Sequence, residues 1–250
     1  MPPSAITREV PRSIQQCELT FQARVPIDLV RARAQHAEYQ RVLAKHGYEV
    51  VELPEEPDSP DSVFVEDVAV IFDECAVITR PGAASRRGEI PTVRDVLQRY
   101  RTLQELKEPA TLDGGDVLRL GRRVFVGLST RTNREGVAQL TALLAPFGYE
   151  VIPVVVHGSL HLKSVATPVA DDLVVVDAQA IDPASFGVRY IEVPAAAANM
   201  LRLTDAILCP VGCAAAAGRL AATGLHVELI DNSELAKAEG ALTCCSLLID

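Results

Sequence analysis

The sequence lacks tryptophan altogether, and aromatic residues make up only 4% of its 250 positions. Valine, alanine and leucine must therefore fill the interior, and the hydrophobic content of 48% is enough for a sizeable core. No run of 18 apolar residues is present, so we expect no membrane-spanning helix. The segment 1–10 contains prolines and charges but no apolar stretch typical of a secretion signal. We therefore expect a cytoplasmic protein.

Cysteines are also few for this length, and their spacing is not typical of a disulfide scaffold or a zinc site. The six thiols include no Cys-x-x-Cys pair, so reduced cysteines are the default expectation. No glycine loop has the spacing that binds nucleotide phosphates. The net charge of −9 disfavours nucleic acid or an anionic membrane as a partner. It suits a site that attracts a cation, although scattered surface carboxylates would give the same total.

What the sequence does contain is a repeated pattern. A short apolar strand follows the end of a helix, a loop with acidic, basic or thiol side chains comes next, and further strands follow. Such self-similarity indicates one supersecondary unit used repeatedly, because each unit needs its neighbours to bury its apolar faces. Helix-ending glycines are predicted at Gly47, Gly148, Gly187 and Gly224. The five opening strands are predicted at Glu49–Leu53, Thr102–Leu106, Glu150–Val155, Arg189–Val193 and His226–Ile230.

The repeats predict an α/β fold in which five units surround an axis. We expect a first strand near Cys17–Arg24 that pairs with the last strand of the chain. Such a closed ring would remove every exposed sheet edge. No linker or change in composition marks a boundary, so we expect residues 1–250 to form a single catalytic domain. Equivalent loops of the units would then converge at the axis.

Two residues in these loops are candidates for covalent chemistry. Cys244 lies at the start of a terminal apolar strand, where its neighbour Cys245 would point to the opposite face. A thiolate is a soft nucleophile, and the imidazole of His161 can act as an acid or a base near neutral pH. The alternatives are a buried structural cysteine and an exposed loop histidine.

Carboxylates and arginines occupy the other loops. The motif Leu112–Asp116 (LDGGD) combines glycines that permit a tight turn with acids that could orient the histidine or bind a cation. In Asp61–Asp67 (DSVFVED), three acids surround an apolar trio, which suits a pocket for a guanidinium or an amine. Arg86 and Arg131 lie in loops and could bind a substrate carboxylate. A plain turn, a solvated acidic rim and solvated arginines are the alternative interpretations.

Six motifs follow one another along nearly the whole chain, from about Arg8 to Ile249. They read PDSVFVEDVAVIF, ITRPGAASRR, ATLDGGDVL, VGLSTRTN, LHLKS and LTCCS. In this order they resemble the dimethylarginine dimethylaminohydrolase family of the guanidino-group-modifying (pentein) superfamily, and the animal-type enzymes most closely. The resemblance implies a five-bladed α/β propeller of ββαβ repeats around a pseudo-five-fold axis, with the site in a central depression.

The resemblance also implies roles for individual residues. The segment Ala238–Gly240 departs from the family's more usual Val-Asp-Gly, so only a backbone contact is implied there. The implied catalytic residues are the nucleophile Cys244, the general acid and base His161, and the supporting carboxylate Asp113. The implied substrate-binding residues are Glu66 and Asp67 at the guanidinium end, Asp61, Arg86 and Arg131 at the amino-acid end, and the backbone carbonyls of Leu19 and Ala238.

The implied reaction is hydrolysis of Nω-methylated L-arginine to L-citrulline and methylamine or dimethylamine, through a covalent thiouronium adduct of the cysteine. No cofactor is expected, and Zn²⁺ trapped by Cys244 and His161 would be an inhibitor. We expect a small-molecule substrate, no nucleic-acid or membrane partner, and a monomer or a homodimer.

Two rival hypotheses are kept. The first is an arginine deiminase-like hydrolase of another guanidino compound. The short length of the chain speaks against it, because the resemblance implies that arginine deiminases carry an extra helical insertion, for which this chain has no room. The second is a catalytically silent protein that binds arginine derivatives. The intact thiol, imidazole and carboxylate speak against it, because a binding protein needs no nucleophile.

Overall fold

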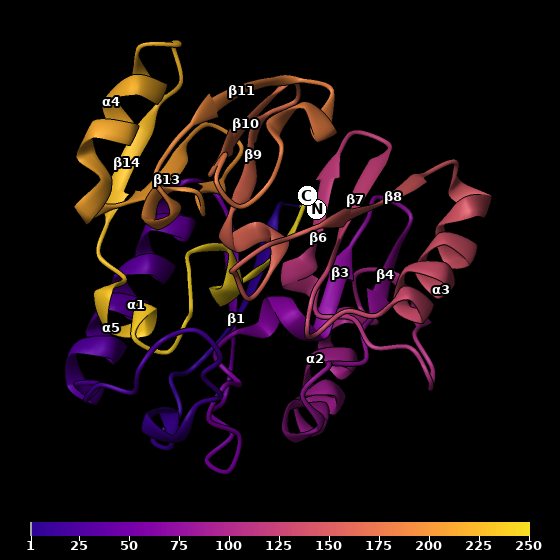
Figure 1. Cartoon of the computed structure of the whole chain (residues 1–250). Helices are drawn as coiled ribbons and strands as arrows, with labels where there is room; N and C mark the ends of the chain where they lie inside the picture. Colours follow the sequence, from indigo (N-terminus) through magenta and orange to yellow (C-terminus); the bar gives the residue numbers. More distant parts are fainter. Residues whose placement is uncertain (1) are drawn as a thin grey trace.

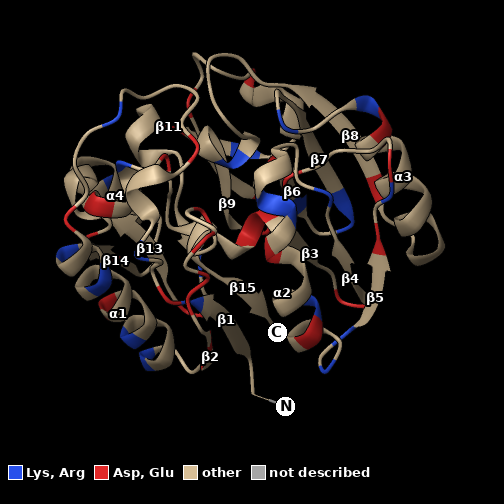
Figure 2. Cartoon of the chain, turned by 90° about the horizontal axis from the view of Figure 1, so that it is seen from below, with Lys and Arg blue, Asp and Glu red and all other residues tan. Residues whose placement is uncertain are grey.

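The computed structural model describes residues 2–250, which form five three-stranded sheets arranged in a ring (Figure 1). In each sheet the middle strand pairs antiparallel with an inner strand and parallel with an outer strand. Figure 2 shows these sheets around a common centre. The expected five-bladed α/β propeller is confirmed.

Each of the five blades consists of an inner, a middle and an outer strand, in that order. They are β15 (Leu247–Ile249), β1 (Ser4–Arg8) and β2 (Glu49–Leu53); β3 (Ala69–Ile71), β4 (Cys75–Ile78) and β5 (Thr102–Glu105); β6 (Val117–Leu120), β7 (Arg123–Leu128) and β8 (Glu150–Val155); β9 (Ala166–Ala170), β10 (Leu173–Val176) and β11 (Arg189–Glu192); β12 (Leu201–Arg202), β13 (Ile207–Pro210) and β14 (Val227–Ile230).

A helix connects the middle strand to the outer strand in four blades, as parallel pairing requires. These helices are α1 (Leu29–Lys45), α2 (Ile90–Leu97), α3 (Arg134–Leu144) and α4 (Ala214–Ala221), and a short α5 (Ser233–Ala236) follows β14. In the remaining blade the 3₁₀ helix Pro183–Phe186 replaces the α-helix. The predicted helix-ending glycines have φ between +60° and +91°, the left-handed region that glycine adopts without a steric penalty.

The predicted strand at Cys17–Arg24 is wrong, because this segment is a loop. The N-terminal strand is β1, and Ser4 lies opposite Ile249 of β15. All of β1 is buried because it is the middle strand of its sheet, so its sequence shows no alternation of polar and apolar residues. The two termini do close the ring (Figure 1). The sheets stay separate, however, and each keeps its own edge strands, so the expectation that closure removes every edge is also wrong.

Shortly before each inner strand, the chain forms a 3₁₀ turn, and we call these five segments the axial turns. The first contacts the second and the fifth, and the second contacts the third, so residues far apart in sequence meet at the centre. The fifth turn contains Cys244 and Cys245, so the expectation of opposite faces on a strand does not apply to them. The axial turns are Val65–Val68, Gly114–Asp116, Leu162–Ser164, Ala195–Ala197 and Thr243–Cys245.

The core follows the same repetition. Buried apolar side chains of the described residues form five clusters. One of them, for example, joins Phe72 to Leu140 of α3 and Tyr149 before β8. No helix between residues 2 and 250 is long and apolar enough to cross a bilayer.

Candidate active site

The axial turns and their flanking loops enclose a small cavity. Its wall includes the thiol-bearing Cys244, the imidazole-bearing His161 and the carboxylate of Asp113, which come from three different blades. The structure therefore brings together the three residues that the resemblance implies as catalytic. Five of the implied substrate-binding residues also line this cavity: Asp61, Asp67, Arg86, Arg131 and Ala238.

Two implied substrate-binding residues do not line it. Leu19 is half-buried and packs against the core beside α1. Glu66 lines a separate cavity of about 220 Å³ between the inner strands. There its carboxylate accepts hydrogen bonds from Lys163 Nζ and from Thr243 Oγ1, the latter at 2.8 Å. Glu66 therefore does not line the cavity that contains Cys244.

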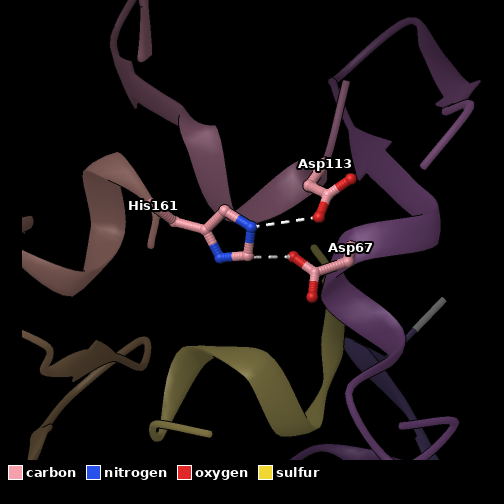
Figure 3. A group of neighbouring side chains, drawn as sticks. All are labelled: Asp67, Asp113 and His161. Atoms are coloured by element: carbon pink, nitrogen blue, oxygen red, sulfur yellow. Dashed lines mark hydrogen bonds and ion pairs between the residues drawn. The ribbon is translucent and has the colours of Figure 1, made fainter. Parts of the chain in front are cut away.

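His161 lies between two carboxylates (Figure 3). Its Nε2 is 3.0 Å from Oδ2 of Asp113, and its Nδ1 is 3.9 Å from Oδ1 of Asp67. The other oxygen of Asp113 accepts a hydrogen bond from the Gly82 amide at 2.8 Å, which fixes the orientation of the carboxylate. Asp113 is fully buried and His161 is 4% exposed, so little water screens the pair.

The two glycines of the LDGGD motif allow this close approach. A Cβ at Gly115 would lie 2.6 Å from Nδ1 of His161, and one at Gly114 would lie 1.9 Å from the carbonyl oxygen of Glu66. Neither glycine has a positive φ, so the requirement is for space rather than for an unusual backbone conformation. The paired glycines therefore bring three axial turns within contact of one another.

The carboxylates determine the protonation state of the site. Burial lowers the pKa of His161, but Asp67, Asp113 and Asp116 outweigh it and raise the pKa to about 9. Burial, with Glu66 and Asp67, raises the pKa of Cys244 well above its ordinary value. At neutral pH the free site therefore holds an imidazolium and a neutral thiol.

Arg86 is not free to act as a surface arginine. It is 4% exposed, and its guanidinium donates hydrogen bonds to the carboxylates of Asp67 and Glu89. It also donates to the carbonyl oxygens of Asp61 and Phe64 at 3.2 and 2.9 Å. Burial alone would raise the pKa of Asp67, but His161 and Arg86 hold it below its ordinary value. The interpretation of Arg86 as a solvated loop arginine is therefore wrong.

The cavity is small, at about 20 Å³, which is room for roughly one water molecule. The loop after Cys17 contributes Glu18 to the cavity wall, and Glu239 holds the following residues of this loop in place. The Glu239 carboxylate accepts backbone hydrogen bonds from Thr20, Phe21 and Gln22 at 3.0, 2.5 and 2.6 Å. A hollow of about 620 Å³ lies next to the cavity and shares Leu160, Glu239 and Gly240 with it.

Sequence reasoning missed a role for Glu239, which has a φ of +58° and is the one non-glycine residue with positive φ among residues 2–250. The departure from the family pattern at Ala238–Gly240 was the available signal. It also missed Glu18, Phe64 and Leu160, which line the cavity; Phe64 and Leu160 lie within quoted motifs, but their apolar side chains gave no chemical signal.

Comparisons with known proteins identify the family of this chain. A family model described as "N,N dimethylarginine dimethylhydrolase, eukaryotic" matches residues 12–186. The N(G),N(G)-dimethylarginine dimethylaminohydrolase of Streptomyces coelicolor is 37% identical over 246 residues, which cover 97% of this chain and 95% of that protein. The chain belongs to the dimethylarginine dimethylaminohydrolase family.

Solved structures of this family share the fold. The enzyme from Pseudomonas aeruginosa, crystallised as a cysteine-to-serine variant with citrulline, has a TM-score of 0.94 and 31% identity, and the match covers 99% of each chain. The N-terminal domain of a cyanobacterial arginine dihydrolase has a TM-score of 0.88 at 19% identity, covering 99% of this chain and 98% of that one. The second likeness concerns the fold alone.

One group of possible metal ligands lies in this site among the described residues. One atom each of Asp67, Asp113 and His161 lies within 4.8 Å of the other two. These atoms already have partners, because His161 binds Asp113, while Asp67 binds Arg86 and accepts a hydrogen bond from the Gly115 amide at 3.0 Å. Ion pairing therefore accounts for the cluster.

Proposed function

We propose that this protein hydrolyses Nω-methylated L-arginine to L-citrulline and methylamine or dimethylamine, with Cys244 as nucleophile. The observation that carries the proposal is the enclosure of a thiol, an imidazole and several buried carboxylates in one cavity, in a chain of this family. This combination suits nucleophilic attack on a cationic carbon centre.

The cavity is built for a cation. Its wall carries the carboxylates of Glu18, Asp61, Asp67, Asp113 and Glu239 against two arginines. In a water-poor site, carboxylates in fixed geometry bind a guanidinium strongly. We assign Asp67 to the guanidinium end, and Asp61, Arg131 and the Ala238 carbonyl to the amino-acid end. Arg86 and Glu66 would act without contacting the substrate. Arg86 holds the Asp67 carboxylate by a hydrogen bond, and the charge of Glu66 adds to burial in raising the pKa of Cys244.

The substrate itself would activate the nucleophile. The free site disfavours the thiolate, because burial and the carboxylates of Glu66 and Asp67 raise the pKa of Cys244. A bound guanidinium introduces a positive charge beside the sulfur, which stabilises the thiolate and lowers this pKa. The reactive thiolate would therefore form mainly when a substrate is present.

The bond changes then follow in order. The Cys244 thiolate attacks the guanidinium carbon and forms a C–S bond, and the C–N bond to the methylated nitrogen breaks as His161 donates a proton to the departing amine. Water then attacks the S-alkylthiouronium carbon while neutral His161 accepts its proton. The C–S bond then breaks with its electron pair on sulfur, the added hydroxyl becomes the carbonyl of citrulline, and the proton of that hydroxyl passes to the sulfur, which restores the Cys244 thiol. The raised pKa of His161 keeps its proton available at neutral pH for the first step.

No cofactor takes part in these steps. Zn²⁺ would act as an inhibitor, since a thiolate and an imidazole are ligands that zinc prefers, and zinc bound to Cys244 and His161 would block the attack. We keep a single catalytic domain, a cytoplasmic location and a monomer or homodimer as predictions.

The proposal is tested by measuring citrulline and dimethylamine released from asymmetric dimethylarginine by purified protein with a metal chelator present. Equal amounts of both products are expected, and Cys244→Ser should release neither. If arginine yields ammonia faster than dimethylarginine yields dimethylamine, the arginine deiminase-like alternative replaces this proposal. Substrate binding without turnover, unchanged by Cys244→Ser, would identify a silent binding protein instead.

A further inference from the structure

Asp116 is a buried carboxylate that takes no direct part in the proposed bond changes, although its charge helps to raise the pKa of His161. It ends the second axial turn, is fully buried, and does not line the cavity. Its Oδ1 accepts a hydrogen bond from the Leu162 amide at 3.0 Å. Its Oδ2 accepts hydrogen bonds from Ser129 Oγ and Thr132 Oγ1, both at 2.6 Å.

Each of these three donors is linked to a residue of the cavity wall, either as its neighbour in the chain or through one hydrogen bond. Leu162 directly follows His161 in the chain. The hydroxyl of Thr132 accepts a hydrogen bond from the amide of Asp113 at 3.2 Å. The hydroxyl of Ser129 accepts one from the amide of Arg131 at 3.0 Å.

The direction of these bonds follows from chemistry. An ionised carboxylate accepts hydrogen bonds and cannot donate them, so both hydroxyls must give their protons to Asp116. Their lone pairs are then available to the backbone amides of Asp113 and Arg131. An uncharged amide at this position would offer its own N–H groups to one hydroxyl, so it could not support the same network.

The chain makes room for this carboxylate on its other side as well. A Cβ at Gly127 of β7 would lie 2.6 Å from Oδ1 of Asp116, so the backbone of β7 packs directly against it. Oδ1 and Oδ2 are thus held between β7, the loop after it and the third axial turn.

We propose that Asp116 is a positioning residue that fixes Asp113, Arg131 and His161 relative to one another for the reaction. This inference rests on the proposed function. Asp113 and His161 belong to the chemical step, whereas Arg131 belongs to substrate binding. Loss of Asp116 should therefore affect both kcat and KM, and loss of each hydroxyl should affect mainly one of them.

The test compares three variants that remove one part of the network each. Asp116→Asn keeps the shape of the side chain, and we expect kcat/KM for dimethylarginine to fall about 100-fold, with lower kcat and higher KM. Thr132→Val should lower kcat about tenfold with little change in KM, because it releases Asp113. Ser129→Ala should raise KM about tenfold with a smaller change in kcat, because it releases Arg131.

Two further variants serve as controls. Thr132→Ser keeps the hydroxyl and should restore most of the kcat that Thr132→Val loses. Asp182→Asn makes the same chemical change at an exposed turn away from the cavity, where the side chain accepts from the Ala184 amide and asparagine caps equally well. It should behave as the unchanged protein does.

A merely structural role predicts a different result. It would lower the melting temperature and the folded fraction, reduce apparent kcat equally in all three variants, and leave KM unchanged. That pattern, or wild-type kinetics in Asp116→Asn, would overturn the inference.

If the unchanged protein releases no product, the proposed function fails, and hydrogen exchange tests Asp116 separately. Under that outcome, faster exchange of the amides of Asp113, Arg131 and Leu162 in Asp116→Asn supports the network. Unchanged exchange overturns it.

Discussion

Arg86 and Asp67 form an ion pair that is buried beside the candidate nucleophile. The guanidinium also binds Glu89, and burial raises the pKa of Glu89 to about 7 despite this partner. The fold therefore uses Arg86 to neutralise carboxylates that it buries. Arg131 differs, because it is half-buried and its guanidinium makes a long contact of 3.4 Å with Thr20 Oγ1.

This contrast predicts different consequences for two similar substitutions. Arg86→Ala leaves buried carboxylates without their partner and should lower the free energy of unfolding by about 3–5 kcal/mol. Arg131→Ala should leave stability nearly unchanged and raise KM. Urea unfolding and steady-state kinetics on both variants measure this. A normal unfolding midpoint for Arg86→Ala would contradict the prediction.

The two adjacent cysteines provide a matched pair. Cys244 lines the cavity, whereas Cys245 is 2% exposed, does not line it, and its thiol donates to the Ala241 carbonyl at 3.4 Å. Cys244→Ser should abolish citrulline release in a folded protein, and Cys245→Ser should keep substantial activity. Mass spectrometry of the protein quenched during turnover should find the adduct on Cys244. An adduct on Cys245, or the reverse pattern of activities, would show that the nucleophile is assigned wrongly.

The charged His161 should make stability depend on pH. Its pKa is raised from 6.5 to about 9 in the folded state, so the folded protein binds this proton more tightly than the unfolded chain. The resulting stabilisation is fully present below pH 6.5 and is lost as the pH rises through about 9.

Between pH 7 and 8.5 the wild-type free energy of unfolding should therefore decrease with pH, by up to about 1.4 kcal/mol per unit from this group. His161→Asn should remove that part of the dependence. Denaturant unfolding at several pH values measures both slopes, and equal slopes in the two proteins would refute the prediction.

Glu239 should control the opening of the cavity. The cavity of about 20 Å³ is too small for an arginine derivative, and we expect the loop that contains Thr20–Gln22, which Glu239 holds by three hydrogen bonds, to move when substrate enters. Glu239→Gln keeps an acceptor oxygen but removes the charge that strengthens these hydrogen bonds. We expect faster hydrogen exchange of the amides of Thr20–Gln22, with unchanged exchange in the distant strand β10. Wild-type exchange in the loop would mean that other contacts hold it.

The sequence predicted the repetition well because repetition has a local cause. Four of the five units end their helix with a glycine, every unit has a short apolar strand that pairs in the sheet, and both features leave a readable pattern. The convergence of Asp113, His161 and Cys244 followed from the equivalence of their loops, and these residues do line one cavity.

The errors arise where burial or long-range contacts decide the structure. β1 was missed because a fully buried middle strand has no polar side, and Arg8 within it is buried against Glu56. The loop at Cys17–Arg24 is ordered by Glu239, more than 200 residues away in sequence, which no local pattern reveals. The environments of Arg86 and Asp116 likewise depend on partners from other segments.

The five axial turns have one further consequence. Four of them carry acids, a lysine or thiols, with His161 directly before the third, whereas Ala195–Ala197 offers only methyl groups, and Ala195 and Ala196 line the outer hollow. Each turn leads into the inner strand of its own blade, and the alanine turn borders the hollow of about 620 Å³ rather than the cavity that contains Cys244. A larger or charged side chain introduced at Ala195 or Ala196 would therefore change the shape and charge of this hollow rather than of the cavity that contains Cys244.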